Sequence, residues 1–296
     1  MSKIQSDDVG GTWEMLASVV LFSANALLIR AASLQSAEID GWLAILFRGV
    51  IGVLLLQFFF GRGGKLSWRR IFTNRLMLGR GLLGGFATIL FYLTITELGP
   101  ARATVLNLTY PMFAAVIAAC WLKEKVSVAT RWWLLIALLG LLIFLGIGGL
   151  GKAPSFYDFI ALLGAVAAGW VVVIIRKLRN KEHPATIYGA LVICTVFLGL
   201  PSVGKLPELP SAAWVILVIA GCLAMLGQLK MTSAYQRMSV ARGASLQMAL
   251  PVFTAAGAYV FFGESFQLHE LIGAVITLFA IWRVSTGKTK TPAIGD

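Results

Sequence analysis

The sequence ARATVLNLTYPMF at residues 101–113 returns as ARGASLQMALPVF at residues 241–253, 140 positions further along the chain. The same offset relates Glu124 to Glu264. Both copies lie inside long apolar segments, and each carries a proline. A repeat of this length predicts two related halves. When matching membrane segments of two halves both contain a helix breaker, the breakers are expected at the interface between the halves.

The composition is typical of a membrane protein with many spans. Hydrophobic residues make up 58% of the 296 residues and charged residues 13%, whereas soluble domains carry about 25% charged residues. The apolar runs are continuous rather than alternating, which predicts helices and not a β-barrel. Ten runs are long enough to cross about 30 Å of hydrocarbon. They are 12–32, 40–60, 76–98, 102–122, 129–148, 156–178, 185–204, 212–236, 241–262 and 268–285.

The net charge of +12 follows the membrane topology. With ten spans, one side of the membrane carries Lys3, Arg62, Lys65, Arg69, Arg70, Arg75, Lys123, Lys125, Arg131, Arg176, Lys177, Arg179, Lys181, Arg237, Arg242, Arg283, Lys288 and Lys290. The opposite side carries Arg102, Lys152 and Lys205. By the positive-inside rule, both termini are predicted to be cytoplasmic in a cell inner membrane. The basic residues therefore indicate orientation, and no nucleic-acid partner is expected.

Two repeats of five spans each are predicted at residues 12–148 and 156–285. Five is an odd number, so the second repeat should be inverted relative to the first. The expected fold class is an all-α integral membrane protein of two inverted five-helix repeats. The three cysteines lie inside apolar spans without a CxxC pattern, so no disulfide, metal site or cofactor is expected.

The sequence resembles the drug/metabolite transporter superfamily, in its ten-span type with two EamA domains, and several residues carry this resemblance. They are Arg48 in the second span, Arg80-Gly81 at the start of the third, and the Pro111–Glu124 spacing that recurs as Pro251–Glu264. The resemblance covers nearly the whole chain. It implies an inner-membrane carrier, usually an exporter, with a central cavity walled by spans 1, 3, 4, 6, 8 and 9. Cargoes in the superfamily range from amino acids to vitamins, nucleotide sugars and organic anions, so the resemblance does not name the cargo.

The two prolines predict the position of a binding site. A proline cannot donate to the carbonyl four residues back, which belongs to Asn107 before Pro111 and to Gln247 before Pro251. Each repeat thus places a free carbonyl and a side-chain amide at the same kink. A water-filled cavity would supply partners for these groups; alternatively, each amide bonds to an adjacent helix. Asn107 and Gln247 are candidate substrate-binding residues, and the prolines are candidate hinges.

Three basic residues fall within spans, where a central Arg or Lys costs roughly 2.5 to 3.5 kcal/mol. Arg48 and Arg80 lie nearer the span ends and are interpreted mainly as scaffold residues, with Arg80 kept as a binding candidate. Lys230 is deeper in its span. It is predicted to contact the substrate, which would then carry a carboxylate or another anionic group.

Further candidates depend on their position in the spans expected to line the cavity. Aromatic rings there could stack on a flat ligand or simply pack, and a polar residue could bind substrate or another helix. These candidates are Tyr92, Tyr110, Trp170, Tyr235 and Asn25. Glu124 and Glu264 end their spans, where a carboxylate opposes the helix dipole. They are predicted to bond loop amides or a basic residue, in a structural or gating role.

The leading hypothesis is a secondary transporter, an exporter or exchanger, that moves a small polar metabolite by alternating access. The expected cargo is an organic anion or amino acid; alternatives are a vitamin, a nucleoside-like compound or a cationic metabolite. An integral-membrane enzyme would need clustered His or acidic residues, and both histidines lie in loops, so no catalytic residue is expected. A non-transporting scaffold is the other alternative. The expected partners are the substrate and the lipid bilayer, and the small residues at 81–85 suit a packed bundle or a homodimer face.

Overall fold

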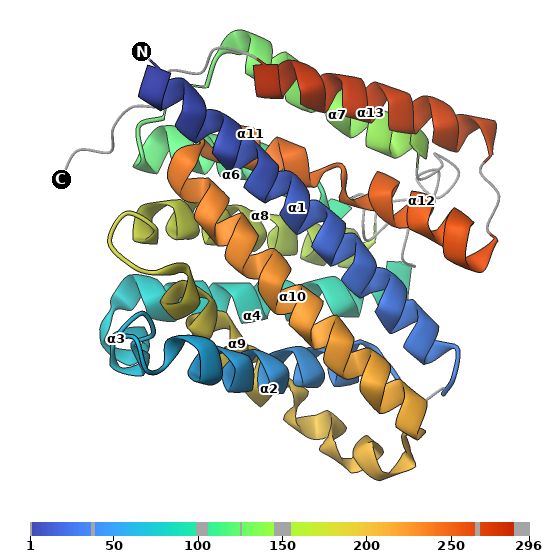
Figure 1. The fold of residues 1–296 in the computed structure, drawn as a ribbon. Coiled ribbons are helices and arrows are strands. Elements are labelled where there is room, and N and C mark those ends of the chain that lie inside the picture. The colour runs from blue at the N-terminus through green and yellow to red at the C-terminus, as the bar shows by residue number, and fades with distance from the viewer. Residues whose placement is uncertain are drawn as a thin grey trace.

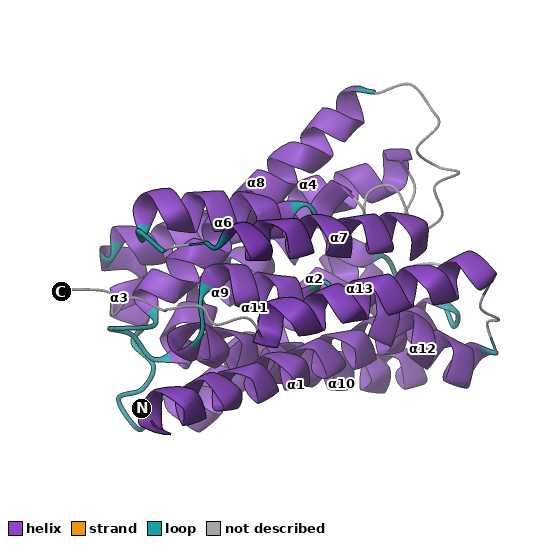
Figure 2. Ribbon diagram, turned by 90° about the horizontal axis from the view of Figure 1, so that it is seen from above, coloured by secondary structure: helices purple, strands orange, loops and turns teal. Residues whose placement is uncertain are grey.

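The computed structural model describes residues 2–36, 39–98, 106–124, 126–144, 155–263 and 267–286. Within these ranges the chain is helical and contains no strand (Figure 2), which confirms the all-α fold class. The first half holds α1 (Ser2–Ser33), α2 (Gly41–Phe60), α3 (Trp68–Thr73), α4 (Arg75–Leu98), α6 (Tyr110–Trp121) and α7 (Val128–Phe144). The second holds α8 (Phe156–Leu178), α9 (Pro184–Gly199), the 3-10 helix η2 (Leu200–Glu208), α10 (Ser211–Arg237), α11 (Val240–Gln247), α12 (Leu250–Phe262) and α13 (Leu268–Thr286).

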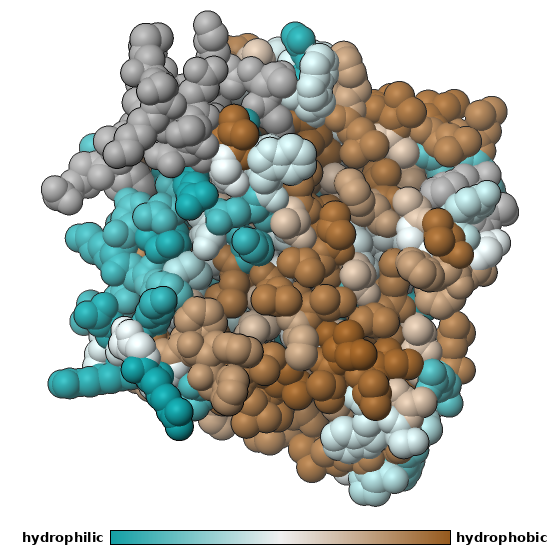
Figure 3. Space-filling model, in the orientation of Figure 1, coloured by the Kyte–Doolittle hydropathy of each residue, from teal (hydrophilic) through white to brown (hydrophobic). Residues whose placement is uncertain are grey.

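In the described ranges, six helical segments are long and apolar enough to cross a membrane. They are Val9–Ser33, Gly41–Phe60, Phe156–Leu178, Pro184–Glu208, Ser211–Arg237 and Val240–Phe262. In Figure 3 hydrophobic residues cover the middle of the molecule, and hydrophilic residues gather at the left edge, near α3 in Figure 1. The protein is therefore a multi-pass membrane protein, and the count of ten spans stays a prediction.

The helices of the two halves pack on one another in matching pairs (Figure 1). Helix α1 packs on α10 as α8 packs on α4, and α6 packs on α8 as α12 packs on α1. Helix α2 also packs on α10 as α9 packs on α4. This exchange is the pattern expected of two repeats related by a pseudo-two-fold axis. The core is thus shared between the halves.

Equivalent helices meet across this axis at α7 and α13. The Thr277 hydroxyl donates to the Ala137 carbonyl at 3.4 Å, and these two positions are 140 residues apart, the offset of the sequence repeat. A side chain added at Gly140 would meet Thr277, and one added at Gly273 would meet Phe144. Moving along α7 from Ala137 to Phe144, the facing residue on α13 moves back from Thr277 to Gly273. The two helices are therefore antiparallel. Equivalent helices that run in opposite directions show that the second repeat is inverted.

Helices α2 and α9 form a second such pair. A side chain at Gly49 would lie 2.8 Å from Val196, and one at Gly52 would lie 2.6 Å from Val192. These contacts again run in opposite directions along the two helices. Small residues allow this close approach of two helix backbones. The antiparallel α2–α9 pair shows the same inverted relation in a second part of the bundle.

The small residues at 81–85 pack inside the bundle. A side chain at Gly81 would lie 2.6 Å from the carbonyl oxygen of Ala190, and one at Gly85 would collide with the Cys194 sulfur. Both contacts are with α9 of the same chain. The structure therefore supports close packing of Gly81 and Gly85 within the bundle, and a homodimer stays a prediction.

Candidate functional site

A cavity of about 270 Å³ lies between helices of both repeats. Its walls come from α1, α2, α4, α8, α9 and α10, from Asn107 just before α6 and Tyr110 at its start, and from Gln247 at the end of α11. Its polar lining residues are Asn25, Arg48, Arg80, Thr88, Asn107, Tyr110, Thr195, Gln228 and Gln247. Among the described lining residues there is no Asp or Glu. The volume is close to the lower end of small-molecule sites.

The prolines interrupt their spans instead of only kinking them. Residues 106–107 are helical, 108–109 form a turn, and α6 begins at Tyr110 with Pro111 in its first turn. In the second repeat α11 ends at Gln247, and α12 begins after a short turn with Pro251 in its first turn. A proline fits the first turn of a helix because the backbone N–H there has no partner within the helix. Each span therefore consists of two helical pieces with a break at cavity depth.

The two breaks meet at the cavity. Asn107 and Gln247 both line it, and the Tyr110 hydroxyl donates to Gln247 Oε1 at 2.8 Å across the two repeats. The other amide atom, Gln247 Nε2, is buried and has no hydrogen-bond partner among the described residues. The structure thus places on one cavity the two amides that the proline positions predicted. Their contact with substrate stays a prediction.

We expect the prolines and the amides to affect transport differently. Pro111→Ala and Pro251→Ala would let a continuous helix form, so turnover should fall while expression is kept. Asn107→Leu and Gln247→Leu each remove a polar group from the cavity, so the apparent KM should rise by about 2- to 10-fold, the value of one hydrogen bond. Transport kinetics in proteoliposomes measure both effects. Wild-type kinetics in all four variants would contradict the placement of the site.

Asn25 lines the cavity and also ties two helices together. Its side-chain Nδ2 donates to the carbonyl of Ala220 on α10 at 2.8 Å. Asn25 was expected to bind either the substrate or another helix, and the structure shows the bond to another helix. Its position still leaves it facing the cavity.

The charged part of the cavity, which we call the cationic corner, consists of Arg48, Arg80 and Gln228. Arg48 donates to Gln228 Oε1 at 3.1 Å and lies 5.8 Å from the centroid of the Phe22 ring. Arg80 is 2% exposed, and its side chain forms no ion pair or hydrogen bond with any described residue. Three buried donors in this corner, Arg48 Nε, Arg80 Nε and Gln228 Nε2, have no hydrogen-bond partner in the part of the chain that the structure describes.

Three predicted site residues lie elsewhere, so their predicted placement in the cavity is wrong. Lys230 is exposed, Trp170 is 37% exposed and stacks edge-on with Trp121, and Tyr235 is fully buried in the apolar core. None of them lines the cavity. The Tyr92 side chain and Glu264 lie outside the described part of the chain.

Helix geometry explains two of these corrections. Each residue of an α-helix turns by about 100°, so residues two apart face nearly opposite ways. Gln228 lines the cavity while Lys230 does not, and Ala168 lines it while Trp170 does not. Arg48 and Gln228 are the important residues that the sequence did not single out as binding candidates. The repeat offset could have indicated Gln228, because it corresponds to Thr88, which also lines the cavity.

A buried ion pair closes one end of the cavity. Glu124 is 5% exposed and accepts from Arg176 Nε at 3.3 Å. Its other oxygen accepts from the backbone N–H of Val240, the first residue of α11, at 3.0 Å. Arg176 also donates to the carbonyls of Tyr235 and Gln236 at 2.7 and 2.6 Å. This Glu124 network confirms that Glu124 bonds to a backbone amide and a basic residue, and it joins α6 to α8, α10 and α11.

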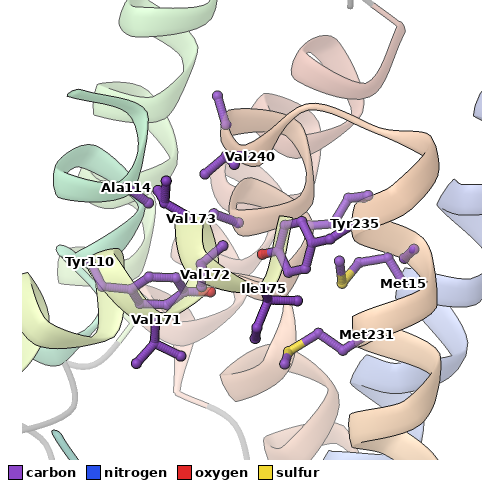
Figure 4. Packing of buried hydrophobic residues seen from close by; sticks show 14 of the residues in the cluster. Met15, Tyr110, Ala114, Val171, Val172, Val173, Ile175, Met231, Tyr235 and Val240 are labelled. Atoms are coloured by element: carbon purple, nitrogen blue, oxygen red, sulfur yellow. The ribbon is translucent and has the colours of Figure 1, made fainter. Parts of the chain in front are cut away.

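The Glu124 network borders the largest apolar core of the described chain. We call this region the closed end: it is where α1 and α11 begin and where α6, α8 and α10 finish. Its core includes Met15, Ala114, Val173, Ile175, Met231, Tyr235, Met238 and Val240. In Figure 4 Tyr110 and Tyr235 lie on either side of Val172, with their hydroxyls turned toward it. Tyr110, Val172 and Met231 belong both to this core and to the cavity wall, so the core forms the floor of the cavity.

Comparisons with known proteins agree with this architecture. The EamA-like transporter family matches residues 15–146 and again residues 155–286. The Pseudopaline exporter CntI of Pseudomonas aeruginosa is 27% identical over 277 residues, which cover 93% of this chain and 95% of that protein. An S-adenosylmethionine uptake transporter of Rickettsia felis is 27% identical over 282 residues, 91% of each chain. A crystal structure with 18% identity superposes with a TM-score of 0.71 over 93% of this chain and 96% of its own, which shows the fold. The chain belongs to the EamA-like transporter family, a family of membrane transporters and not of enzymes.

Proposed function

We propose that this chain is a secondary transporter, an exporter or exchanger, of a small polar metabolite that carries a carboxylate or another anionic group. The observation that supports this most directly is the cationic corner. Arg80 is buried beside Arg48 without a hydrogen-bonding or ion-pairing partner among the described residues, in a cavity whose described lining contains no carboxylate. Lys230 no longer supports an anionic cargo, because it is exposed. The support now comes from Arg48 and Arg80.

The energetics of charge favour an anionic ligand at this corner. A buried guanidinium without a partner is costly, and charged residues within membrane spans usually meet a partner or a water-filled path. A carboxylate can accept two parallel N–H bonds from one guanidinium. A ligand with such a group would supply acceptors for the three unpaired donors of the corner. A wholly cationic ligand would be repelled.

Alternating access is supported by the inverted repeats, which are typical of carriers whose two halves rock around a central site. The closed end seals the cavity on one side, and the matching conformation would separate Glu124 from Arg176 and Val240. The breaks before Pro111 and Pro251 supply hinges at cavity depth. The charge distribution supports an inner-membrane topology with ten spans and cytoplasmic termini, which makes the closed end cytoplasmic.

The direction of transport is proposed as export or exchange. A relative named as an exporter and a relative named as an uptake transporter are equally similar in identity, at 27% each. Likeness to one relative therefore does not fix the direction. The superfamily resemblance, with its usual exporters, favours outward movement.

Uptake into proteoliposomes tests the proposal. The panel holds amino acids, dicarboxylates, purines and cationic metabolites, and protein-free liposomes are the control. We expect transport of at least one carboxylate-bearing compound and competition by other anions. Efficient transport of a wholly cationic compound, with no transport of any anionic or zwitterionic one, would contradict the proposal.

A further inference from the structure

We infer that transport is an obligatory exchange, because the cationic corner prevents the empty carrier from reorienting. An anion-bearing molecule must then travel back through the cavity before the next one can move forward. The inference rests on the proposed anionic cargo and adds the mode of transport. It follows from the two positive charges of the cationic corner, from the neutral groups around them, and from the buried apolar core at the closed end.

The corner is charged near neutral pH, because arginine side chains keep their protons there. The contacts that the structure shows for the Arg48 guanidinium are neutral. They are the Gln228 amide, the Phe22 ring and the Tyr188 hydroxyl. Arg80 has no hydrogen-bonding or ion-pairing partner among the described residues. Two like charges therefore stay in the cavity when no ligand is present.

The occluded step makes this charge costly. While one side of the cavity is open, water can solvate both guanidinium groups. Between the two open states both ends are closed, water is largely excluded, and the loss of hydration and the mutual repulsion both grow in the lower dielectric. A bound carboxylate accepts N–H bonds from the corner and offsets one charge. The loaded carrier should therefore pass through the occluded state faster than the empty one.

The described part of the cavity has no residue that could couple the return of the empty carrier to a proton. Transporters that couple to protons use acidic or histidine side chains within the membrane as proton relays. No Asp or Glu lines this cavity among the described residues. Glu124 is buried at the closed end and is already engaged by Arg176 and by the Val240 N–H. The return step thus requires a second anion instead of a proton.

The first test follows the closed end directly and needs no knowledge of the cargo. Val240 is fully buried there, so Val240→Cys, with Cys120, Cys194 and Cys222 replaced by Ser, should react with a hydrophilic maleimide only when that end opens. In chloride buffer without organic anions, the added pair Arg48→Gln and Arg80→Gln should raise the labelling rate by roughly 10-fold or more, a factor that corresponds to about 1.4 kcal/mol. The pair Arg48→Lys and Arg80→Lys keeps the charge and should leave the rate within about 2-fold of the parent.

A second reporter separates gate opening from unfolding. Leu141 on α7 is also fully buried, and Leu141→Cys should stay unreactive in every background. If the Gln pair labels no faster than the parent at Val240→Cys, or the Lys pair labels as fast as the Gln pair, the inference is overturned. Equal labelling of both reporters would mean that the Gln pair is unfolded, and the second test below then decides.

The second test uses the unmodified protein in proteoliposomes. Uptake of labelled malate, glutamate or citrate is compared between vesicles that contain the same unlabelled compound and vesicles that contain only chloride buffer. We expect uptake to be roughly 10-fold faster into the preloaded vesicles, with no change when an ionophore removes the pH gradient. Equal uptake into both kinds of vesicle would disprove obligatory exchange and leave anion transport standing. Absence of any anion transport over the full panel would instead disprove the proposed function.

Discussion

Arg80→Gln is expected to lower kcat/KM for the anionic cargo by about 10- to 100-fold, the value of a hydrogen bond to a charged group. The same change should not lower the melting temperature, because it removes a buried charge that has no ion-pairing partner among the described residues. A purely structural arginine would show the opposite combination, with lost stability and normal kinetics in the surviving protein. Transport kinetics and thermal unfolding in detergent, measured on the same preparation, separate these outcomes.

Two further variants calibrate this experiment. Arg80→Lys keeps the charge but loses the planar fork of donors, so it should restore only part of the activity. Lys230→Gln also removes a basic residue from within a predicted span, but this side chain is exposed and does not line the cavity. Its kinetics should match wild type. A loss of transport in Lys230→Gln equal to that in Arg80→Gln would show that general membrane charge, and not the corner, is responsible.

Glu124→Ala is expected to destabilise the protein by about 3 to 5 kcal/mol, because it leaves Arg176 buried without its carboxylate. Both side chains of this pair are at most 5% exposed. The variant also removes the acceptor for the Val240 N–H at the start of α11. We therefore expect both a lower melting temperature and faster labelling of Val240→Cys at the closed end.

The matched control is the ion pair of Arg70 and Glu182 on the same side of the molecule. Its N–O distance is 3.0 Å, but the Arg70 side chain is 61% exposed. Exposed pairs contribute about 0 to 1 kcal/mol, so Glu182→Ala should change the melting temperature little. If Glu124→Ala and Glu182→Ala had equal effects on stability and labelling, the Glu124 network would not hold the closed end.

The repeat in the sequence was informative about the fold and about half of the site. The offset of 140 residues predicted two halves, and Thr277 and Ala137 meet at that offset in the structure. The prolines led to Asn107 and Gln247, which lie on the same cavity. A backbone break can be located in this way because proline acts through its own local geometry.

The charged half of the site could not be found in the same way. Position along a span gives the depth of a side chain but not the direction in which it points. Lys230 and Gln228 have nearly the same depth, and only the packing of α10 against its neighbours decides that Gln228 faces inward. Arg48 is a common scaffold position by the family resemblance, yet it reaches the cavity. Such directions depend on contacts between helices distant in sequence, which a local pattern does not contain.

The exchange of partners between the repeats has a consequence for biosynthesis. Helix α1 packs chiefly on α10, and the Asn25 amide bonds to an α10 carbonyl 195 residues later in the chain. At about 5 to 20 residues per second, α1 must wait for roughly 10 to 40 seconds in the membrane before this partner is made. During that time the Asn25 amide remains in lipid, open to bonding with other proteins or to the cell's quality control. A chain that stops after the first repeat would keep α1 in this state permanently, so premature termination should give a rapidly degraded fragment and not a functional half.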